Sequence, residues 1–299
     1  MHDAVIPAAL GSPAPRWPAA WPVAAGLLAV LGPSVYALAT GLWLSEDHSH
    51  GIIVLAALLW MLWSERAAFS QPVRPMPAPG WALLGLGAAL YVLGRSQDIL
   101  LFEVGAFIPL LAGAALLLYG AALLRRLAFF FVFLLFLLPL PGSLVDALTT
   151  PLKHQVSALS ASLLYAAGYP IAKSGVILHL GPYQLLVADA CSGMRSMFSL
   201  AATGAMYLYL SGRRHPLHLG LLVLSILPIA FLANTLRVVT LALITFYLGD
   251  AAAQSYLHDL ASVSLYLFAL ALLIGLDYLL GALPWLRAAR PPANPGRSG

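Results

Sequence analysis

The sequence predicts an all-α protein that crosses a membrane several times. Of its 299 residues, 61% are hydrophobic and only 9% are charged, and the mean hydropathy is +0.90. Soluble domains carry about 25% charged residues, which they need to cover their surface with groups that water solvates. Soluble enzymes, disordered proteins and nucleic-acid-binding proteins are therefore excluded as classes.

Apolar stretches that suit membrane helices recur along the chain, since about 20 apolar residues are needed to cross a bilayer. We expect about eight transmembrane helices, of which the second and third are short. They lie near residues 18–42, 50–64, 80–95, 99–120, 124–141, 195–211, 215–236 and 261–282.

The stretch between the fifth and sixth spans has a different character. Residues 144–167 mix apolar and polar side chains in a pattern typical of an amphipathic helix at the membrane interface. Residues 170–188 alternate apolar and small polar residues around one Ser-Gly and one Gly-Pro pair. This pattern predicts a short hairpin or an extended segment.

Basic residues gather in alternate loops, and this sets the expected orientation. With the N-terminus inside, most of the 15 Lys and Arg fall in cytoplasmic segments, and the outer segments are mainly acidic. We expect both termini in the cytoplasm and a single membrane domain over residues 1–286. The tail, 287–299, is rich in Pro, Gly and Arg and is expected to be disordered.

The only cysteine, Cys191, lies at the expected outer start of a span. A helix N-terminus favours an anion, so a thiolate is stabilised there, and Arg195 one turn further on adds positive charge. A lone membrane cysteine is more often a small buried hydrophobic residue. The polar neighbours of Cys191, Asp189 and Ser192, favour the reactive interpretation.

Two further polar positions fall on the same predicted membrane face. An arginine amid apolar residues, as Arg237 is, indicates a functional site unless it snorkels to the interface, and Asn234 adds a second polar group one turn away. His258, just before the last span, is either a general acid or base or a solvated loop histidine. A thiol, a base and a fixed cation are what cysteine acyl transfer requires.

Carboxylates and histidines also occur together in the run 45–51, which includes Glu46, His48 and His50. Their spacing matches no specific metal motif. We therefore expect no metal here, and favour a binding or packing role at the outer face.

Taken together, these residues resemble the exosortase family of bacterial inner-membrane enzymes. Ala190-Cys191-Ser192-Gly193-Met194-Arg195 resembles its Ala-Cys-Ser-Gly-X-Arg motif, and Asn234-Thr235-Leu236-Arg237 its Asn-X-X-Arg motif. Ser49-His50-Gly51 resembles an early Ser-His-Gly motif, and His258 follows at the expected distance. The resemblance covers most of the chain. Where the family commonly has a glycine four residues after its histidine, this chain has Ser262.

The resemblance implies a cysteine endopeptidase or transpeptidase with no cofactor, acting at the outer face of the inner membrane. The implied substrates are exported proteins with a Pro-Glu-Pro-like motif, a transmembrane helix and a basic tail, cleaved near the membrane and passed to an unidentified acceptor. Cys191 would attack, Arg237 would stabilise the oxyanion, and His258 would exchange protons. The supporting or substrate-binding residues would be Asp189, Ser192, Gly193, Arg195, Asn234, Ser49 and His50.

Two other functions stay open from the sequence. A non-enzymatic carrier or assembly protein in exopolysaccharide export would use Arg237 for binding and would not need Cys191. A metal-dependent intramembrane protease would use Glu46, His48 and His50, and would be inhibited by chelators, whereas a thiol enzyme would be blocked by alkylation.

Overall fold

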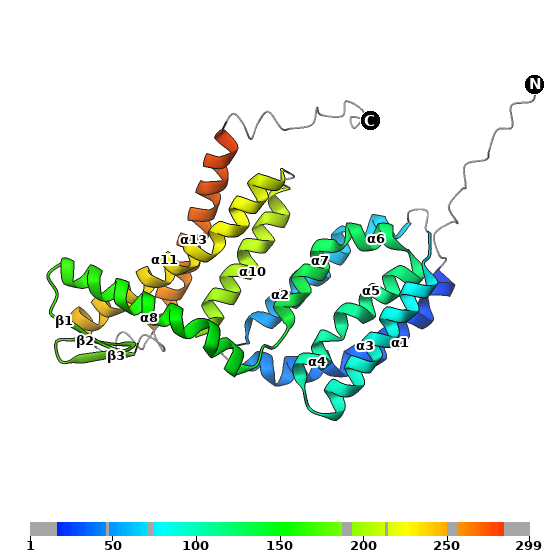
Figure 1. Ribbon diagram of the computed structural model, residues 1–299, viewed down its shortest axis with the longest axis horizontal. Helices are drawn as coiled ribbons and strands as arrows, with labels where there is room; N and C mark the ends of the chain where they lie inside the picture. The colour runs from blue at the N-terminus through cyan, green and yellow to red at the C-terminus, as the bar shows by residue number, and fades with distance from the viewer. Residues whose placement is uncertain are drawn as a thin grey trace, which may run out of the picture. The chain divides into compact units, whose positions relative to one another are not determined.

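The computed structural model describes residues 17–45, 48–70, 74–186, 193–212, 215–249 and 256–283. Within these ranges, the side chains at 17–19, 148, 193–198, 256–259 and 261–262 are outside the description. The chain divides into two compact units, Met1–Pro141 and Gly142–Gly299, and each is described by itself (Figure 1).

The first unit is entirely helical in its described part, with short connections between the elements. Its helices are α1 (Trp17–Thr40), α2 (His50–Ser64), α3 (Pro77–Ser96), α4 (Leu100–Gly105), α5 (Phe107–Leu118), α6 (Ala121–Arg126) and α7 (Ala128–Phe133). Shorter 3-10 segments are η1 (Leu42–Leu44), η2 (Arg66–Ser70) and η3 (Leu134–Leu137).

Helix α3 packs closely against α4 and α5 through a row of glycines. Gly80, Gly87 and Gly94 are buried on one face of α3, seven residues apart. A Cβ at Gly87 would lie 2.7 Å from the Leu110 side chain, and a Cβ at Gly94 would overlap the backbone of Glu103. Small residues allow such close backbone approach in membrane helix pairs. The partner residues are also seven apart: Leu117, Leu110 and Glu103.

A buried carboxylate joins three helices of this unit. Glu103 of α4 is 6% exposed, and its Oε1 accepts hydrogen bonds from Arg95 Nη1 of α3 at 2.8 Å and from Ser34 Oγ of α1 at 2.5 Å. The hydroxyl of Tyr91 lies 3.2 Å from the same serine oxygen. Because a buried charge is costly without partners, this arrangement offsets the desolvation of Glu103.

The first unit also contains a cavity of about 720 Å³ between α1, α2, η2, α5, α6 and α7. Most of its lining is apolar, and Arg66, Ser70 and Tyr119 are polar residues in the lining. Its volume lies within the range of small-molecule binding sites.

The second unit combines helices with a small sheet. Its elements are α8 (Gly142–Ala166), β1 (Ile171–Ser174), β2 (Ile177–Leu180), β3 (Tyr183–Leu186), α10 (Gly193–Ser211), α11 (Pro216–Leu248) and α13 (Tyr256–Ala282). The strands form one antiparallel sheet in the order β1-β2-β3. We expected a hairpin or extended segment over 170–188; three strands occupy most of it, joined by turns at Gly175 and Gly181, which both have positive φ.

Helix α11 is longer than the sequence pattern predicted. We expected this span to end near residue 236, which was wrong, because the helix continues to Leu248. No glycine or proline follows Pro228 until Gly249, where φ is +83°. At 33 residues the helix is about 50 Å long, well beyond the roughly 30 Å hydrocarbon core.

Helix α8 and the sheet pack on the C-terminal half of α11. Val156 of α8 and Leu178 of β2 form a buried cluster with Val238 and Leu241 of α11. A second, adjoining cluster joins α8, β2 and α11 through Leu164, Leu180 and Ala242. These contacts cover the part of α11 that follows Arg237.

The membrane character of the protein is clear, although eight spans are not confirmed. Five described helical segments are long and apolar enough to cross a membrane, and a sixth is counted if one broken helix pair forms a single span. The five are Ala20–Leu44, Pro77–Ser96, Leu100–Leu118, Pro216–Leu248 and Val263–Ala282, and the shorter α2 is also apolar.

Candidate functional site

Arg237 lies in the middle of the packed region of α11. Only 3% of this residue is exposed, although it is surrounded in the sequence by Leu, Val and Thr. A snorkelling arginine keeps its charged head in water, so this burial argues against the snorkelling alternative. A buried cation in a membrane helix is, by default, part of a functional site.

A second buried polar side chain lies one turn before Arg237. Asn234 is 6% exposed, and within the described part of the chain no hydrogen bond reaches its Oδ1 atom. Nearby, Ser160 Oγ of α8 donates to the carbonyl oxygen of Thr235 at 3.5 Å, so α8 lies against this turn of α11. Buried acceptors are almost always satisfied, and an exception needs an explanation such as a ligand.

The expected nucleophile lies outside the described residues. Cys191, Asp189 and Ser192 precede Gly193, where α10 begins. Arg195 lies on α10 and His258 on α13, but the description does not extend to their side chains. The convergence of Cys191, Arg237 and His258 therefore stays a prediction.

The two earlier candidates belong to the first unit. Ser49 directly precedes α2, and His50 is its first residue. The rings of His48 and His50 are 6.4 Å apart and nearly parallel. Among the side chains that the structure describes, no three of His, Cys, Asp or Glu are grouped as a metal site requires.

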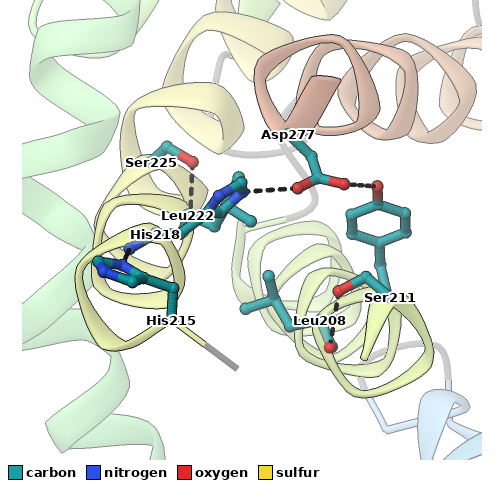
Figure 2. A network of polar contacts seen from close by, with 8 residues as sticks. Leu208, Ser211, His215, His218, Leu222, Ser225 and Asp277 are labelled. Atoms are coloured by element: carbon teal, nitrogen blue, oxygen red, sulfur yellow. Dashed lines mark hydrogen bonds and ion pairs between the residues drawn. The ribbon is translucent and has the colours of Figure 1, made fainter. Parts of the chain in front are cut away.

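A polar cluster joins the C-terminal ends of α10 and α13 to the N-terminal end of α11, at the ends of these helices away from Arg237 and His258 (Figure 2). Asp277 of α13 accepts a hydrogen bond from the Tyr207 hydroxyl of α10 at 2.7 Å, through Oδ2. Its other oxygen, Oδ1, lies 2.7 Å from Nε2 of His218 of α11. The His218 and Asp277 side chains are only 5% and 6% exposed. We call Tyr207, His218 and Asp277 the polar cluster.

The polar cluster gives the axial register of α11 against α13. Nineteen residues separate His218 from Arg237 on α11, and nineteen separate Asp277 from His258 on α13. The two helices have opposite chain directions and both extend from the cluster toward the candidate site, where Ala233 and Leu265 belong to one buried apolar cluster. At 1.5 Å per residue, the backbones at Arg237 and His258 each lie about 28 Å from the cluster along their own helix, and on α11 this path includes Pro228. The equal spacing places the two positions at a similar level.

The sequence analysis missed the polar cluster, although a signal was present. Asp277 is a carboxylate inside an otherwise apolar span, which is itself an indication of a functional or pairing role. The same holds for Glu103 in the first unit. What the sequence could not supply was the partner of each carboxylate, because the partners lie on other helices.

Comparison with known proteins identifies the family. The model of the family described as transmembrane exosortase matches residues 43–275, which include Cys191, Arg237 and His258. No curated protein and no solved structure matches the chain. The resemblance seen in the sequence motifs is confirmed at the level of the family: this integral membrane protein belongs to the transmembrane exosortases.

Proposed function

We propose that this protein is a membrane-embedded cysteine endopeptidase or transpeptidase that removes C-terminal sorting signals from exported proteins. The observation that carries the proposal is the buried Arg237, one turn from the buried Asn234 and level with His258 along the bundle. Family membership supports the same chemistry. We place the reaction at the outer face of the bacterial inner membrane, with both termini in the cytoplasm.

In the proposed reaction, the thiolate of Cys191 attacks the carbonyl carbon of the scissile peptide bond. The tetrahedral intermediate collapses, the C–N bond breaks, and the substrate is left as a thioester on Cys191. The amine leaves with the apolar helix and basic tail. Water or an acceptor amine then attacks the thioester, which releases the product and regenerates the thiol.

Arg237 is proposed to stabilise the oxyanion. A buried guanidinium acts in a poorly solvated environment, where a fixed cation stabilises developing negative charge more than it does in water. Asn234 is proposed to orient the substrate, because its buried Oδ1 is suited to accept a hydrogen bond from a substrate N–H. His258 is proposed to protonate the leaving amine and then activate the acceptor.

The substrate helix is proposed to lie against the outside of the helices rather than in the first unit's cavity. A helix about 10 Å across fills roughly 420 Å³ per turn. A spanning helix has more than five such turns, so its volume is well above the cavity's volume of about 720 Å³.

The test is co-expression with a tagged exported reporter that ends in a Pro-Glu-Pro motif, an apolar helix and a basic tail. We expect the wild-type chain to remove the reporter's tail and Cys191→Ala to leave it intact, as measured on a gel. Thr203→Ala is a matched control on α10, because Thr203 is exposed and, within the described part of the chain, its hydroxyl bonds the carbonyl of Ser199 on its own helix. Membrane levels of all three proteins are compared first.

Each outcome separates two functions. If wild type and Thr203→Ala process the reporter and Cys191→Ala does not, the result supports the thiol mechanism. Trapping of the thioester by hydroxylamine would then identify the intermediate. Processing by Cys191→Ala would overturn the thiol mechanism. If wild type processes no reporter and Cys191→Ala leaves exopolysaccharide export unchanged, the carrier or assembly protein becomes the better explanation.

A further inference from the structure

The contact between α11 and α13 is mostly apolar along its length, with the polar cluster at one end. Ala230 and Ala233 of α11 meet Leu265 and Ala269 of α13 in one buried cluster. Inside a membrane such a contact is not driven by the hydrophobic effect, because lipid chains are as apolar as the helices. These alanine and leucine contacts contain no directional bonds, so they specify the axial alignment less sharply than hydrogen bonds do.

Glycines do not fix the alignment in the described part of this unit either. A Cβ added at Gly220 of α11 or Gly275 of α13 would meet no atom within 4 Å. A Cβ at Gly204 of α10 would meet the side chains of Ile226 and Leu273, at 3.2 and 3.6 Å, and no backbone. Flexible side-chain ends can move aside, so these glycines do not prevent a helix from sliding.

The polar cluster, in contrast, is directional and specific to one alignment. Both oxygens of Asp277 are engaged at 2.7 Å, one with Tyr207 and one with His218. A slide of one helical turn would separate the partners by about 5.4 Å. The buried His218 and Asp277 side chains would then lose these bonds, which is costly.

The geometry points to a positioning role for Tyr207, His218 and Asp277: they set the axial register of α11 against α13, and thereby keep Arg237 level with His258. Its catalytic consequence rests on the proposed function, whereas the register itself does not. A buried polar residue that specifies register at some expense of stability is the best-attested role of such groups in helix pairs.

The consequence for the reaction follows from the distances. A one-turn slide would displace the backbone at Arg237 relative to His258 by about 5.4 Å. General acid–base and oxyanion contacts require about 3 Å, and a misplacement of 1 Å can lower turnover about 100-fold. The polar cluster acts on the reaction from about 28 Å away, along the lengths of α11 and α13.

The test measures the register directly by spin-label distances. In a Cys191→Ala chain, which has no other cysteine, labels are attached at Leu236→Cys on α11 and Leu279→Cys on α13. Both positions are lipid-exposed, at 45% and 67%, and lie about 30 Å apart along the bundle. Because the two labels are separated mainly along the helix axis, a slide of one turn changes the distance between them by close to 5 Å.

The decisive variant replaces the polar cluster by apolar groups: Tyr207→Phe, His218→Leu and Asp277→Leu together. Such replacements often preserve stability, so we expect an unchanged unfolding temperature but a broadened or shifted distance distribution. In the chain that retains Cys191, turnover of the reporter should fall about 100-fold. The exchange His218→Asp with Asp277→His should restore a narrow distribution.

Matched variants keep the result interpretable. Ser225→Ala on α11 removes a hydroxyl that bonds only the carbonyl of Leu222 on its own helix, and should change neither distance nor turnover. If the apolar triple variant does not insert, Asp277→Asn is measured by the same criteria. A narrow, unshifted distribution in the inserted variant would overturn the inference. A shifted distribution with no reporter processing by wild type would uphold the register role and count against the proposed function alone.

Discussion

Two antiparallel helix contacts, one in each unit, specify the axial alignment of their helices in different ways. Helix α3 meets α4 and α5 through Gly80, Gly87 and Gly94, whose missing side chains admit neighbouring residues to within contact distance. Helix α11 meets α13 through an apolar contact and the polar cluster at one end. The first alignment is specified by shape along its whole length, with the Arg95–Glu103 pair added at one end, whereas the second depends on hydrogen bonds at one level.

The difference matters because only the second contact carries candidate catalytic residues. The glycine row of α3 tolerates little movement of the helix, since any slide brings side chains against backbone. A contact aligned by polar groups has one preferred register and apolar surfaces that still permit small adjustments. The two contacts therefore predict different responses to substitution, given below from the largest effect to the smallest.

The largest effect is expected at Arg237. Arg237→Gln should lower reporter turnover by about 10²–10³-fold, because one buried oxyanion donor contributes that much in comparable enzymes. Arg95→Gln, in the first unit, is the matched comparison: Arg95 binds Glu103, so its loss should lower stability but leave turnover per folded molecule unchanged. Equal turnover losses in both variants would mean that Arg237 acts through folding only.

The second effect tests the glycine row of α3. Gly94→Ala places a Cβ into the backbone of Glu103 and should lower the free energy of unfolding by about 1–3 kcal/mol or more. On the same helix, Gly85 has nothing within 4 Å of an added Cβ. Gly85→Ala should therefore be neutral or stabilising by up to about 1 kcal/mol. Reversible unfolding in detergent measures both, and a similar loss in the two variants would contradict the steric explanation.

A smaller effect is expected from removing a single bond of the polar cluster. Tyr207→Phe removes the hydrogen bond from the Tyr207 hydroxyl to Asp277 and retains the ring. Hydrogen bonds between membrane helices average about 0.6 kcal/mol and reach about 1.7 kcal/mol. The free energy of unfolding should therefore fall by an amount in this range. A loss well above this range, measured in the same unfolding assay, would indicate that Tyr207 supports more than this bond.

The smallest effect is expected where α11 ends. The Tyr169 and Tyr247 hydroxyls are 3.0 Å apart and exposed. The hydrogen bond to Tyr247 raises the pKa of Tyr169 above its ordinary value, with smaller contributions from burial and from the Tyr247 charge. Tyr247→Phe should return that pKa toward 10.0 without changing the unfolding temperature. An ultraviolet pH titration checks the direction, and an unchanged titration would mean that the bond does not persist.

Much of the helical framework could be predicted from the sequence, because apolar runs and breaker residues act locally. The expected span over 50–64 matches α2, and 18–42 differs from α1 by two residues or fewer at each end. The end of α11 could not be predicted, because α8 and the sheet cover a segment that follows the apolar span. Packing partners far away in the chain decided that boundary.

The candidate site was predictable in its residue types but not in its arrangement. Motif spacing singled out Arg237, and its burial is consistent with that choice. The register of α11 against α13 depends on a contact between His218 and Asp277, 59 residues apart. No local pattern encodes such a pair, so sequence reasoning could find the acid as unusual but could not name its partner.

The glycine row of α3 has a consequence for how this gene can vary. Every missense change at a glycine codon adds at least a Cβ, so the genetic code contains no smaller substitute for these three positions. At Gly94 even alanine would overlap backbone, whereas at Gly85, nine residues earlier on the same helix, the added atom meets nothing. Substitutions should therefore be excluded at Gly94 and tolerated at Gly85, although both are glycines of one helix. A deep mutational scan should show this difference without any knowledge of the reaction.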